Sequence, residues 1–290
     1  MAILWYPGGK ARLAGKIVSL FPSIDTYDTF VDVFGGAANV LLAVPDKNGL
    51  LKVYNDIDSD LFNFFSVLRN PEQRNQLVEM LYWTPFSRQQ FKECVEMQVP
   101  KNPVEKAWHF FVLRNQSFGG KARPTPGNWS YGISGEGRHH PKEWTNKVKM
   151  LDNFGEKFRS VQVENLDYKE IFNRYDSESC LFYVDPPYLG DTRGKDILYT
   201  HEMKHKQSHR ELAETLKSAK GMIVLSGYDC PEYQEWYADW EKHTFDVVCS
   251  MSGEGTIRGQ KDKSKGRRTE CVWLNPACAK ARVKQLGLFF

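Results

Sequence analysis

The hydrophobic residues of the first 70 positions form short apolar runs, which alternate with segments where they recur every three or four residues. Apolar runs are typical of buried strands, and the wider spacing is typical of helices that bury one face. Alternating strands and helices predict a parallel sheet covered by helices. The predicted order is a helix at 11–21, a strand at 29–34, a helix entered from the turn at Gly35-Gly36, a strand at 51–54 and a helix at 59–70.

A second alternating part begins near residue 160 and continues to the last apolar segment of the chain. Between the two parts, residues 71–154 are rich in Arg, Gln, Asn, Trp and Pro, which predicts short helices and loops. We therefore expect one α/β domain formed by 1–70 and 155–290, interrupted by an insertion at 71–154. The predicted helices are 72–81, 88–97, 103–113 and 209–219. A strand and a helix are predicted within 160–172, further strands at 181–184, 221–229, 244–251 and 270–275, and a glycine-rich loop at 117–140.

Length, charge and cysteine content limit the class of protein. The 290 residues carry a net charge of +3, which by itself is too small to indicate a nucleic-acid partner. No apolar stretch approaches the roughly 20 residues of a membrane-spanning helix, and the first residues do not resemble a signal peptide. The six cysteines are scattered without a CxxC pair, which argues against disulfides and a zinc site. We expect a cytoplasmic protein without membrane association and without a metal.

The apolar run that ends at Val184 is followed by Asp185, Pro186, Pro187 and Tyr188. Two prolines remove backbone donors and keep the chain extended, so an acid and an aromatic ring are fixed where the strand ends. Ligands bind at this edge of open α/β sheets. The Asp185 carboxylate and the Pro186 carbonyl suit the two N–H groups of an exocyclic amine such as that of adenine. The Tyr188 ring can stack on the base, worth ~1–3 kcal/mol. The alternative interpretation is a proline-rich turn with an exposed acid and ring.

A second candidate ligand site follows the strand at 29–34. The Gly35-Gly36 turn lets backbone amides approach a ligand, and Asp56 at the end of the next strand can accept hydrogen bonds from a ribose. Folds that bind NAD and folds that bind S-adenosylmethionine share this spacing, and the lack of a G-x-G-x-x-G pattern disfavours NAD. The alternative is a tight connection without a ligand. Tyr6 and Lys10 flank a further glycine pair, which indicates either the start of a helix or part of the same site.

Together these segments resemble the Dam-type (D12 class, α group) DNA adenine-N6 methyltransferases. They are spread over nearly the whole chain, and an Asp-Pro-Pro-Tyr segment after a buried strand is highly specific when a separate glycine-rich turn is present. Related enzymes that act on protein glutamine tend to have Asn at the position of Asp185, so the acid favours a nucleic-acid base. The matching segments are YPGGK (6–10), FVDVFGGAANVLL (30–42), VYNDIDSDL (53–61), NLDY (165–168), VDPPY (184–188), LSGYD (225–229) and GRRTECVWLN (266–275).

The resemblance implies a Rossmann-like methyltransferase fold with an inserted, mainly helical target-recognition domain. It also implies S-adenosylmethionine as methyl donor and S-adenosylhomocysteine as product, with Lys10 near the donor's carboxylate and Asp56 at its ribose. The implied catalytic residues are Asp185, Pro186, Pro187 and Tyr188. The implied cofactor-binding residues are Tyr6, Lys10, Asp32, Phe34, Gly35, Gly36, Asp56, Ile57, Asp167, Tyr168 and Asp185.

Double-stranded DNA is the expected partner of two segments. In α-group enzymes the target-recognition domain lies between the two segments that correspond to NDID and DPPY, where the insertion lies in this chain. Its polar, glycine-rich sequence offers donors to base edges and phosphates, and the basic segment 256–270 suits phosphate contacts. Taken singly, each of these residues is more often a solvated or packing residue. The expected DNA-binding residues are Arg114, Asn115, Gln116, Lys121, Arg123, Trp129, Tyr131, Arg138, Arg258, Lys261, Lys265, Arg267 and Arg268.

The sequence thus predicts a monomeric, site-specific methyltransferase of bacterial or phage type that methylates N6 of an adenine flipped out of the duplex. Two alternatives stay open: an RNA adenine methyltransferase, and a catalytically silent DNA-binding protein with the same fold. The target sequence does not follow from the residues, nor does the presence of a cognate restriction endonuclease.

Overall fold

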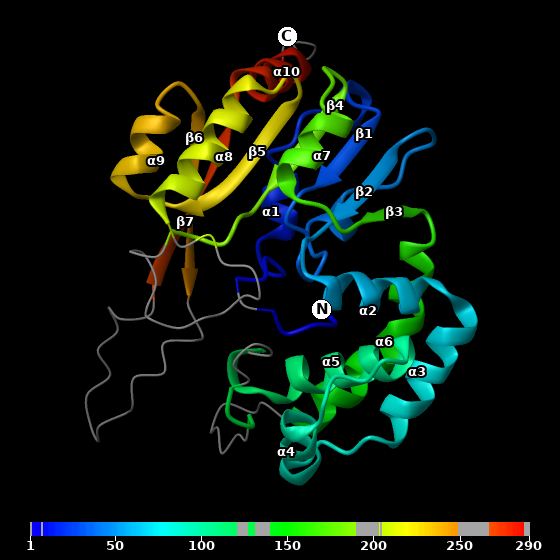
Figure 1. Cartoon of the computed structure of the whole chain (residues 1–290). Coiled ribbons are helices and arrows are strands. Elements are labelled where there is room, and N and C mark those ends of the chain that lie inside the picture. The colour runs from blue at the N-terminus through cyan, green and yellow to red at the C-terminus, as the bar shows by residue number, and fades with distance from the viewer. Residues whose placement is uncertain are drawn as a thin grey trace.

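The described residues form a seven-stranded sheet with helices on both faces (Figure 1). The computed structural model describes residues 2–6, 8–120, 127–130, 140–189, 203, 205–248 and 267–286, without the side chains of 247–248, 267–268 and 284–286. The strands are β1 (Thr29–Asp32), β2 (Leu51–Asn55), β3 (Val161–Glu164), β4 (Cys180–Val184), β5 (Met222–Tyr228), β6 (Glu241–Val248) and β7 (Arg267–Leu274). The α-helices are α1 (Ala14–Val18), α2 (Ser59–Arg69), α3 (Pro71–Trp83), α4 (Arg88–Glu96), α5 (Pro103–Gln116), α6 (His140–Phe158), α7 (Tyr168–Tyr175), α8 (Lys206–Ser218), α9 (Pro231–Trp236) and α10 (Pro276–Leu286).

The order of the strands determines where a ligand can bind. It is β3-β2-β1-β4-β5-β7-β6, and β7 runs antiparallel to both of its neighbours. Strand β1 pairs in parallel with β2 on one side and with β4 on the other. The chain therefore changes direction across the sheet at β1 and β4, and in such sheets a crevice opens at the carboxyl ends of these strands. The predicted α/β class is confirmed.

Alternate residues of the central strands pack into two different cores. In β4, Leu181 and Tyr183 belong to the core that also contains residues of α1, α10 and the helices α2 to α6. Phe182 and Val184 belong to the core beneath α7, α8 and α9. Because both faces of the strand are buried, β4 is a continuous apolar run in the sequence, without polar alternation.

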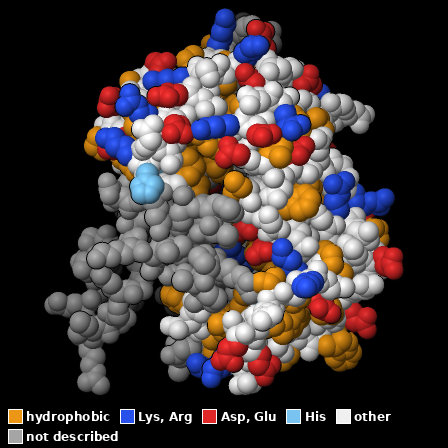
Figure 2. Space-filling model, in the orientation of Figure 1, with side chains coloured by type: hydrophobic (Ala, Val, Ile, Leu, Met, Phe, Trp, Pro, Cys, Tyr) orange, Lys and Arg blue, Asp and Glu red, His pale blue; other side chains and the backbone are white. Residues whose placement is uncertain are grey.

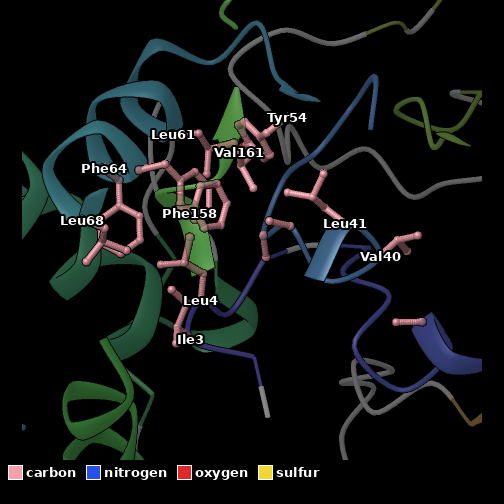
Figure 3. Packing of buried hydrophobic residues seen from close by; sticks show 14 of the residues in the cluster. Ile3, Leu4, Val40, Leu41, Tyr54, Leu61, Phe64, Leu68, Phe158 and Val161 are labelled. Atoms are coloured by element: carbon pink, nitrogen blue, oxygen red, sulfur yellow. The ribbon is translucent and has the colours of Figure 1, made fainter. Parts of the chain in front are cut away.

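Helices α2 to α6 form a helical half that lies below the sheet in Figure 1 and shares one core with it. Phe158, at the end of α6, stacks on Phe65 of α2 with the ring centroids 4.3 Å apart. The ring of Tyr54 from β2 contacts both. Ile3 and Leu4 of the N-terminal segment belong to the same cluster (Figure 3). The helical half is therefore fixed to the sheet by the N-terminal segment and by β2.

Four regions differ from the prediction. The segment after Gly36 forms turns and the short 3-10 helix η2 (Leu41–Ala43) where an α-helix was predicted, because Gly36 and Ala38 have positive φ angles that an α-helix does not allow. Helix α6 has 19 residues and covers the end of the predicted loop and the expected domain boundary at 154. Helices α9 and α10 were not predicted. The helical half thus begins with α2, before residue 71, and continues to Phe158.

Candidate active site

The carboxyl ends of β1, β2 and β4 open onto a cavity of about 230 Å³. Its walls come from the N-terminal segment, the glycine turn after β1, the end of β2, the segment before α7 and the segment after β4. All of the predicted catalytic and cofactor-binding residues line it. They are Tyr6, Lys10, Asp32, Phe34, Gly35, Gly36, Asp56, Ile57, Asp167, Tyr168, Asp185, Pro186, Pro187 and Tyr188. The structure brings these residues together, and their individual roles stay predictions.

The glycine turn after β1 packs so tightly that side chains are excluded. A Cβ atom at Gly35 would lie 2.3 Å from the ring of Tyr54. Gly36 has a φ of +47°, and a Cβ atom there would lie 3.1 Å from the ring of Tyr6. The Tyr54 hydroxyl donates a hydrogen bond of 2.8 Å to the Gly36 carbonyl. The turn therefore presents backbone, and not side chains, to the cavity.

Asp56 follows β2 directly and holds the glycine turn. Its Oδ2 accepts a hydrogen bond from the Gly36 N–H at 2.9 Å, and its Oδ1 accepts one from the Asp58 N–H at 2.9 Å. Burial raises the pKa of Asp56 to about 6, while these two backbone N–H groups act in the opposite direction. Each carboxylate oxygen has a second lone pair, so the group can still accept hydrogen bonds from ligand hydroxyls.

Asn55, which sequence analysis did not single out, joins three segments of the site. Its amide Nδ2 donates to the carbonyls of Val33 and Leu166 at 2.9 and 3.1 Å, and its Oδ1 accepts from the Leu166 N–H at 2.9 Å. The side chain is 1% exposed. It thereby fixes the end of β1 and the segment before α7 to the end of β2. Its position directly before Asp56 was the available signal.

Asp32, at the end of β1, is a buried acid with an unfilled bonding position. It is 1% exposed, and its Oδ1 has no hydrogen-bond partner among the described residues. Burial raises the pKa of Asp32 well above its usual range, and the nearby charge of Asp185 raises it further. Buried polar atoms are nearly always paired in proteins, so this oxygen indicates a missing polar ligand.

The ammonium group of Lys10 occupies the end of the cavity formed by the Asp185–Tyr188 segment. It donates to Asp185 Oδ1 at 2.9 Å and to the Gly8 carbonyl at 3.1 Å, and it also donates to the Tyr188 hydroxyl. Glu270 Oε1, from β7, lies 3.2 Å away. The positive charge of Lys10 therefore lies at the end of the cavity formed by the Asp185–Tyr188 segment. The contact that the resemblance implies between Lys10 and the carboxylate of a cofactor stays a prediction.

Glu270 is an acid that sequence analysis missed, and it contacts two residues of the cavity lining, Lys10 and Tyr188. It is 7% exposed, and its carboxylate accepts a hydrogen bond from the Tyr188 hydroxyl. The ring of Tyr188 also meets the ring of Tyr228, from the end of β5, edge to face at a centroid distance of 4.3 Å. Glu270 lies in one of the segments that carried the resemblance, but its neighbours in the sequence gave no sign that it points into the site.

The opposite end of the cavity is more apolar. The rings of Phe34 and Tyr168 lie 5.9 Å apart, and Ile57 is 36% exposed beside them. Asp167 begins α7 by accepting a hydrogen bond from the Lys169 N–H at 2.9 Å. One end of the cavity thus offers apolar surfaces to a flat ring, and the other offers charged and polar groups.

Two of the expected DNA-binding residues of α5 instead hold the N-terminal segment. Arg114 is 1% exposed, and its guanidinium lies over the ring of Tyr6, 4.5 Å from the centroid. Asn115 Oδ1 accepts hydrogen bonds from the Trp5 N–H at 3.1 Å and from Lys147 Nζ at 2.6 Å. The structure contradicts the exposure that DNA contact by Arg114 requires, because α5 is buried on most sides. Asn115 is half-buried and already bonded within the protein.

Gln116 is also an interior residue, which leads to a testable prediction. It is fully buried; its Oε1 accepts from the Ser87 N–H at 3.1 Å and its Nε2 donates to the Pro85 carbonyl at 3.0 Å. We expect Gln116→Ala to lower the free energy of unfolding in urea by about 2–3 kcal/mol, because two part-buried backbone groups lose their partners and a fully buried side chain is removed from the interior. The exposed Gln98→Ala is the control and should change it by less than about 0.5 kcal/mol. Wild-type stability with weakened DNA binding would restore the original expectation for Gln116.

The remaining expected DNA-binding residues lie mostly outside the described residues. Trp129 is described and half-buried, with its ring 5.4 Å from that of Phe86 and the Arg88 guanidinium 4.7 Å above it. On the face shown in Figure 2, the described acidic and basic side chains are interspersed and do not form one basic patch. Lys121, Arg123, Tyr131, Arg138, Arg258, Lys261 and Lys265 lie outside the described residues, as do the side chains of Arg267 and Arg268, whose backbone belongs to β7.

The described part of the chain contains neither a metal-binding group of side chains nor a helix suited to span a membrane. Nowhere in it do three or more His, Cys, Asp or Glu side chains form a group that could hold a metal ion. None of its helices has the length and apolar character that crossing a membrane requires.

Comparison with known proteins places the chain among enzymes that modify DNA. A family model described as D12 class N6 adenine-specific DNA methyltransferase matches residues 6–251. A DNA adenine methylase of Salmonella typhimurium is 26% identical over 276 residues, covering 90% of this chain and 93% of that protein. The modification methylase StsI of Streptococcus sanguinis is 27% identical over 188 residues, covering 63% of this chain and 28% of that protein.

Proposed function

Because this chain belongs to the D12 class of N6 adenine-specific DNA methyltransferases, we propose that its cavity binds S-adenosylmethionine and receives an adenine flipped out of double-stranded DNA. A single observation carries the proposal. The glycine turn, Asp56 and the Asp185–Tyr188 segment line the same cavity, so a methyl donor and a base can meet there.

The charges of the cavity fit this methyl donor. Its described lining contains five aspartates, Asp32, Asp56, Asp58, Asp167 and Asp185, and one basic residue, Lys10. S-adenosylmethionine carries one net positive charge, so an acid-rich wall favours it. The unpartnered Oδ1 of Asp32 suits the donor's ammonium group, the second lone pairs of Asp56 suit the two ribose hydroxyls, and Phe34, Ile57 and Tyr168 suit the adenine ring.

The protein's own groups position the nucleophile. S-adenosylmethionine, when bound, supplies a methyl group on a sulfonium that is already a good leaving group, and S-adenosylhomocysteine is the product. The Asp185 carboxylate and the Pro186 carbonyl accept hydrogen bonds from the two N–H groups of the adenine amine. This orients the lone pair of the amine toward the methyl group of the donor. The Tyr188 ring stacks on the base, which compensates for part of the stacking lost in the duplex. The amine loses its proton during or after the transfer, so Asp185 need not be a strong base.

The role of the helical half is part of the same proposal. We assign reading of the target sequence to the insertion 71–154, and phosphate contact to the basic segment that precedes Glu270. Arg114, Asn115 and Gln116 support the N-terminal segment and the loops, and do not contact bases. The protein acts as a monomer on one extruded base, because one chain supplies every group that the cavity uses.

Transfer of label identifies the substrate. The purified protein is incubated with methyl-tritiated S-adenosylmethionine and either unmethylated genomic DNA or total RNA, and the nucleic acid is digested to nucleosides. The proposal predicts label in N6-methyldeoxyadenosine. Label in RNA, or in a cytosine product, would overturn the substrate assignment. Binding of S-adenosylmethionine without any transfer would favour the silent DNA-binding alternative.

The pKa of Asp56 gives a pH dependence for cofactor binding. Because this pKa is raised to about 6, the carboxylate is largely protonated at pH 5 and ionised at pH 7. Ribose hydroxyls donate more strongly to the ionised form, so affinity for S-adenosylmethionine should rise with pH, by about tenfold if only the ionised form binds. Calorimetric titration between these pH values measures the effect. Asp56→Asn should flatten the curve, and an unchanged slope in this variant would exclude Asp56 as its origin.

A further inference from the structure

We propose that Glu270 is a positioning residue for methyl transfer, which acts by fixing the hydroxyl of Tyr188. The inference rests on the proposed function, because it concerns how the ring that stacks on the adenine is held. Glu270 comes from β7, a strand that is distant in the sequence from Lys10 and from the Asp185–Tyr188 segment.

The position of Glu270 follows from the sheet. Strand β7 inserts antiparallel between β5 and β6, and its register places Glu270 directly opposite Tyr228, the last residue of β5. Strand β5 in turn lies beside β4, the strand that ends in the Asp185–Tyr188 segment. Glu270 therefore reaches the pocket from the side opposite to β1. Strand β7 is paired on both sides, with β5 and with β6, which fixes the backbone at this position.

Three contacts restrain the far end of Tyr188. The hydroxyl donates to Glu270 Oε1 and accepts from Lys10 Nζ, and the ring edge is restrained by Tyr228 at 4.3 Å. A tyrosine ring turns about two side-chain bonds; fixing the hydroxyl fixes the direction in which the ring points, and the edge contact with Tyr228 limits rotation of its plane. Stacking on a base depends on that plane, and a small misplacement of a group that orients the substrate can cost about 10²-fold in rate.

A carboxylate at this position has a substantial cost that packing alone does not explain. Glu270 and Asp185 are both largely buried and share one cation, Lys10. Burial raises the pKa of Glu270, and the nearby charge of Asp185 acts in the same direction, while Lys10 opposes both. An apolar residue would fill the space at lower cost. We therefore infer that the carboxylate is needed here as the hydrogen-bond acceptor for the Tyr188 hydroxyl.

Two variants distinguish the effect of losing the acceptor oxygen from the effect of changing the volume of the side chain. Glu270→Leu keeps approximate size and removes the acceptor, and we expect it to lower kcat by about 10- to 100-fold with little change in KM for S-adenosylmethionine. Glu270→Gln keeps an acceptor oxygen and should recover most of the lost rate. In a Tyr188→Phe background, Glu270→Leu should have little further effect, because the hydroxyl that it serves is absent.

A control and a second readout keep the test independent of folding and of activity. Glu241→Leu removes a carboxylate from neighbouring β6, where it pairs with Arg282 and His243, and should leave kcat unchanged. The ¹³Cζ resonance of Tyr188, assigned by its loss in Tyr188→Phe, should shift in Glu270→Leu and not in Glu241→Leu, without cofactor or DNA present.

The outcomes distinguish this inference from the proposed function. An unshifted Tyr188 resonance in Glu270→Leu overturns the inference. The inference is also overturned if Glu270→Leu has the wild-type kcat. It is overturned as well if Glu270→Leu lowers kcat by the same factor in the wild-type protein and in Tyr188→Phe. A wild-type protein that transfers no methyl group to any DNA refutes the proposed function, and the resonance then decides whether Glu270 holds Tyr188. If Glu270→Leu does not fold, Glu270→Gln and the resonance of Tyr188 in that variant decide.

Discussion

Replacing Asp185 with alanine should lower the rate of methyl transfer by about 10²- to 10³-fold, while S-adenosylmethionine still binds. The carboxylate is one of two acceptors aimed at the adenine amine in our proposal, so its loss leaves the nucleophile without orientation. The glycine turn and Asp56, which hold the donor in the same proposal, are unaffected. Single-turnover transfer and calorimetric binding, measured on the same preparation, separate the two effects.

Asp229→Ala is a matched control for this prediction. Asp229 follows β5 at the same edge of the sheet, but it is exposed and forms an ion pair of 2.7 Å with Lys242. This variant should transfer methyl groups at the wild-type rate. If Asp185→Ala also retains that rate, the amine is oriented by other groups and the assigned pocket is wrong.

Replacing Lys10 with methionine should destabilise the protein by about 3–5 kcal/mol near pH 8, the usual cost of removing one partner from a buried ion pair. The ammonium is 6% exposed and lies 2.9 Å from Asp185 and 3.2 Å from Glu270, so its removal leaves two carboxylates without a cation. Burial raises the pKa of Glu270, so this acid takes up a proton more readily as the pH falls. The loss of stability should therefore be smaller at pH 5 than at pH 8. Urea unfolding at the two pH values measures it.

Lys47→Met provides the comparison with an exposed pair. Lys47 lies 3.0 Å from Asp25, whose side chain is 79% exposed, so its loss should cost less than about 1 kcal/mol at either pH. Equal unfolding midpoints for Lys10→Met and wild type at pH 8 would show that Lys10 does not neutralise the buried acids.

The strands of the sheet could be predicted because their signals are local. The central strands are buried on both faces, so each is a continuous apolar run, and the prolines after Val184 mark where β4 ends. Helix α6 also has a local signal, buried positions at helical spacing, but two of these positions are not occupied by apolar side chains. Its buried positions are Trp144, Lys147, Val148, Leu151, Gly155 and Phe158, at regular helical spacing. A buried lysine and a glycine stand where apolar residues would have revealed the pattern.

The site could be predicted as far as its residues lie at strand ends. The glycine turn, Asp56 and Asp185 each follow a strand, and parallel strands bring their carboxyl ends together. Glu270 lies within a strand whose neighbours are set by tertiary pairing, so no local pattern revealed it. Arg114 was expected to contact DNA because its side chain offers donors to base edges and phosphates, but its helix is buried through Phe110–Leu113 as well, and only packing shows this.

Photochemical cross-linking of methyl-tritiated S-adenosylmethionine tests most directly whether this cavity is the site of transfer. The protein is irradiated with the bound donor, digested, and its labelled peptides are sequenced, with excess S-adenosylhomocysteine as competitor. Our account predicts competed label in peptides that contain lining residues such as Phe34, Tyr168 or Tyr188. Competed label confined to peptides that do not line the cavity would contradict it.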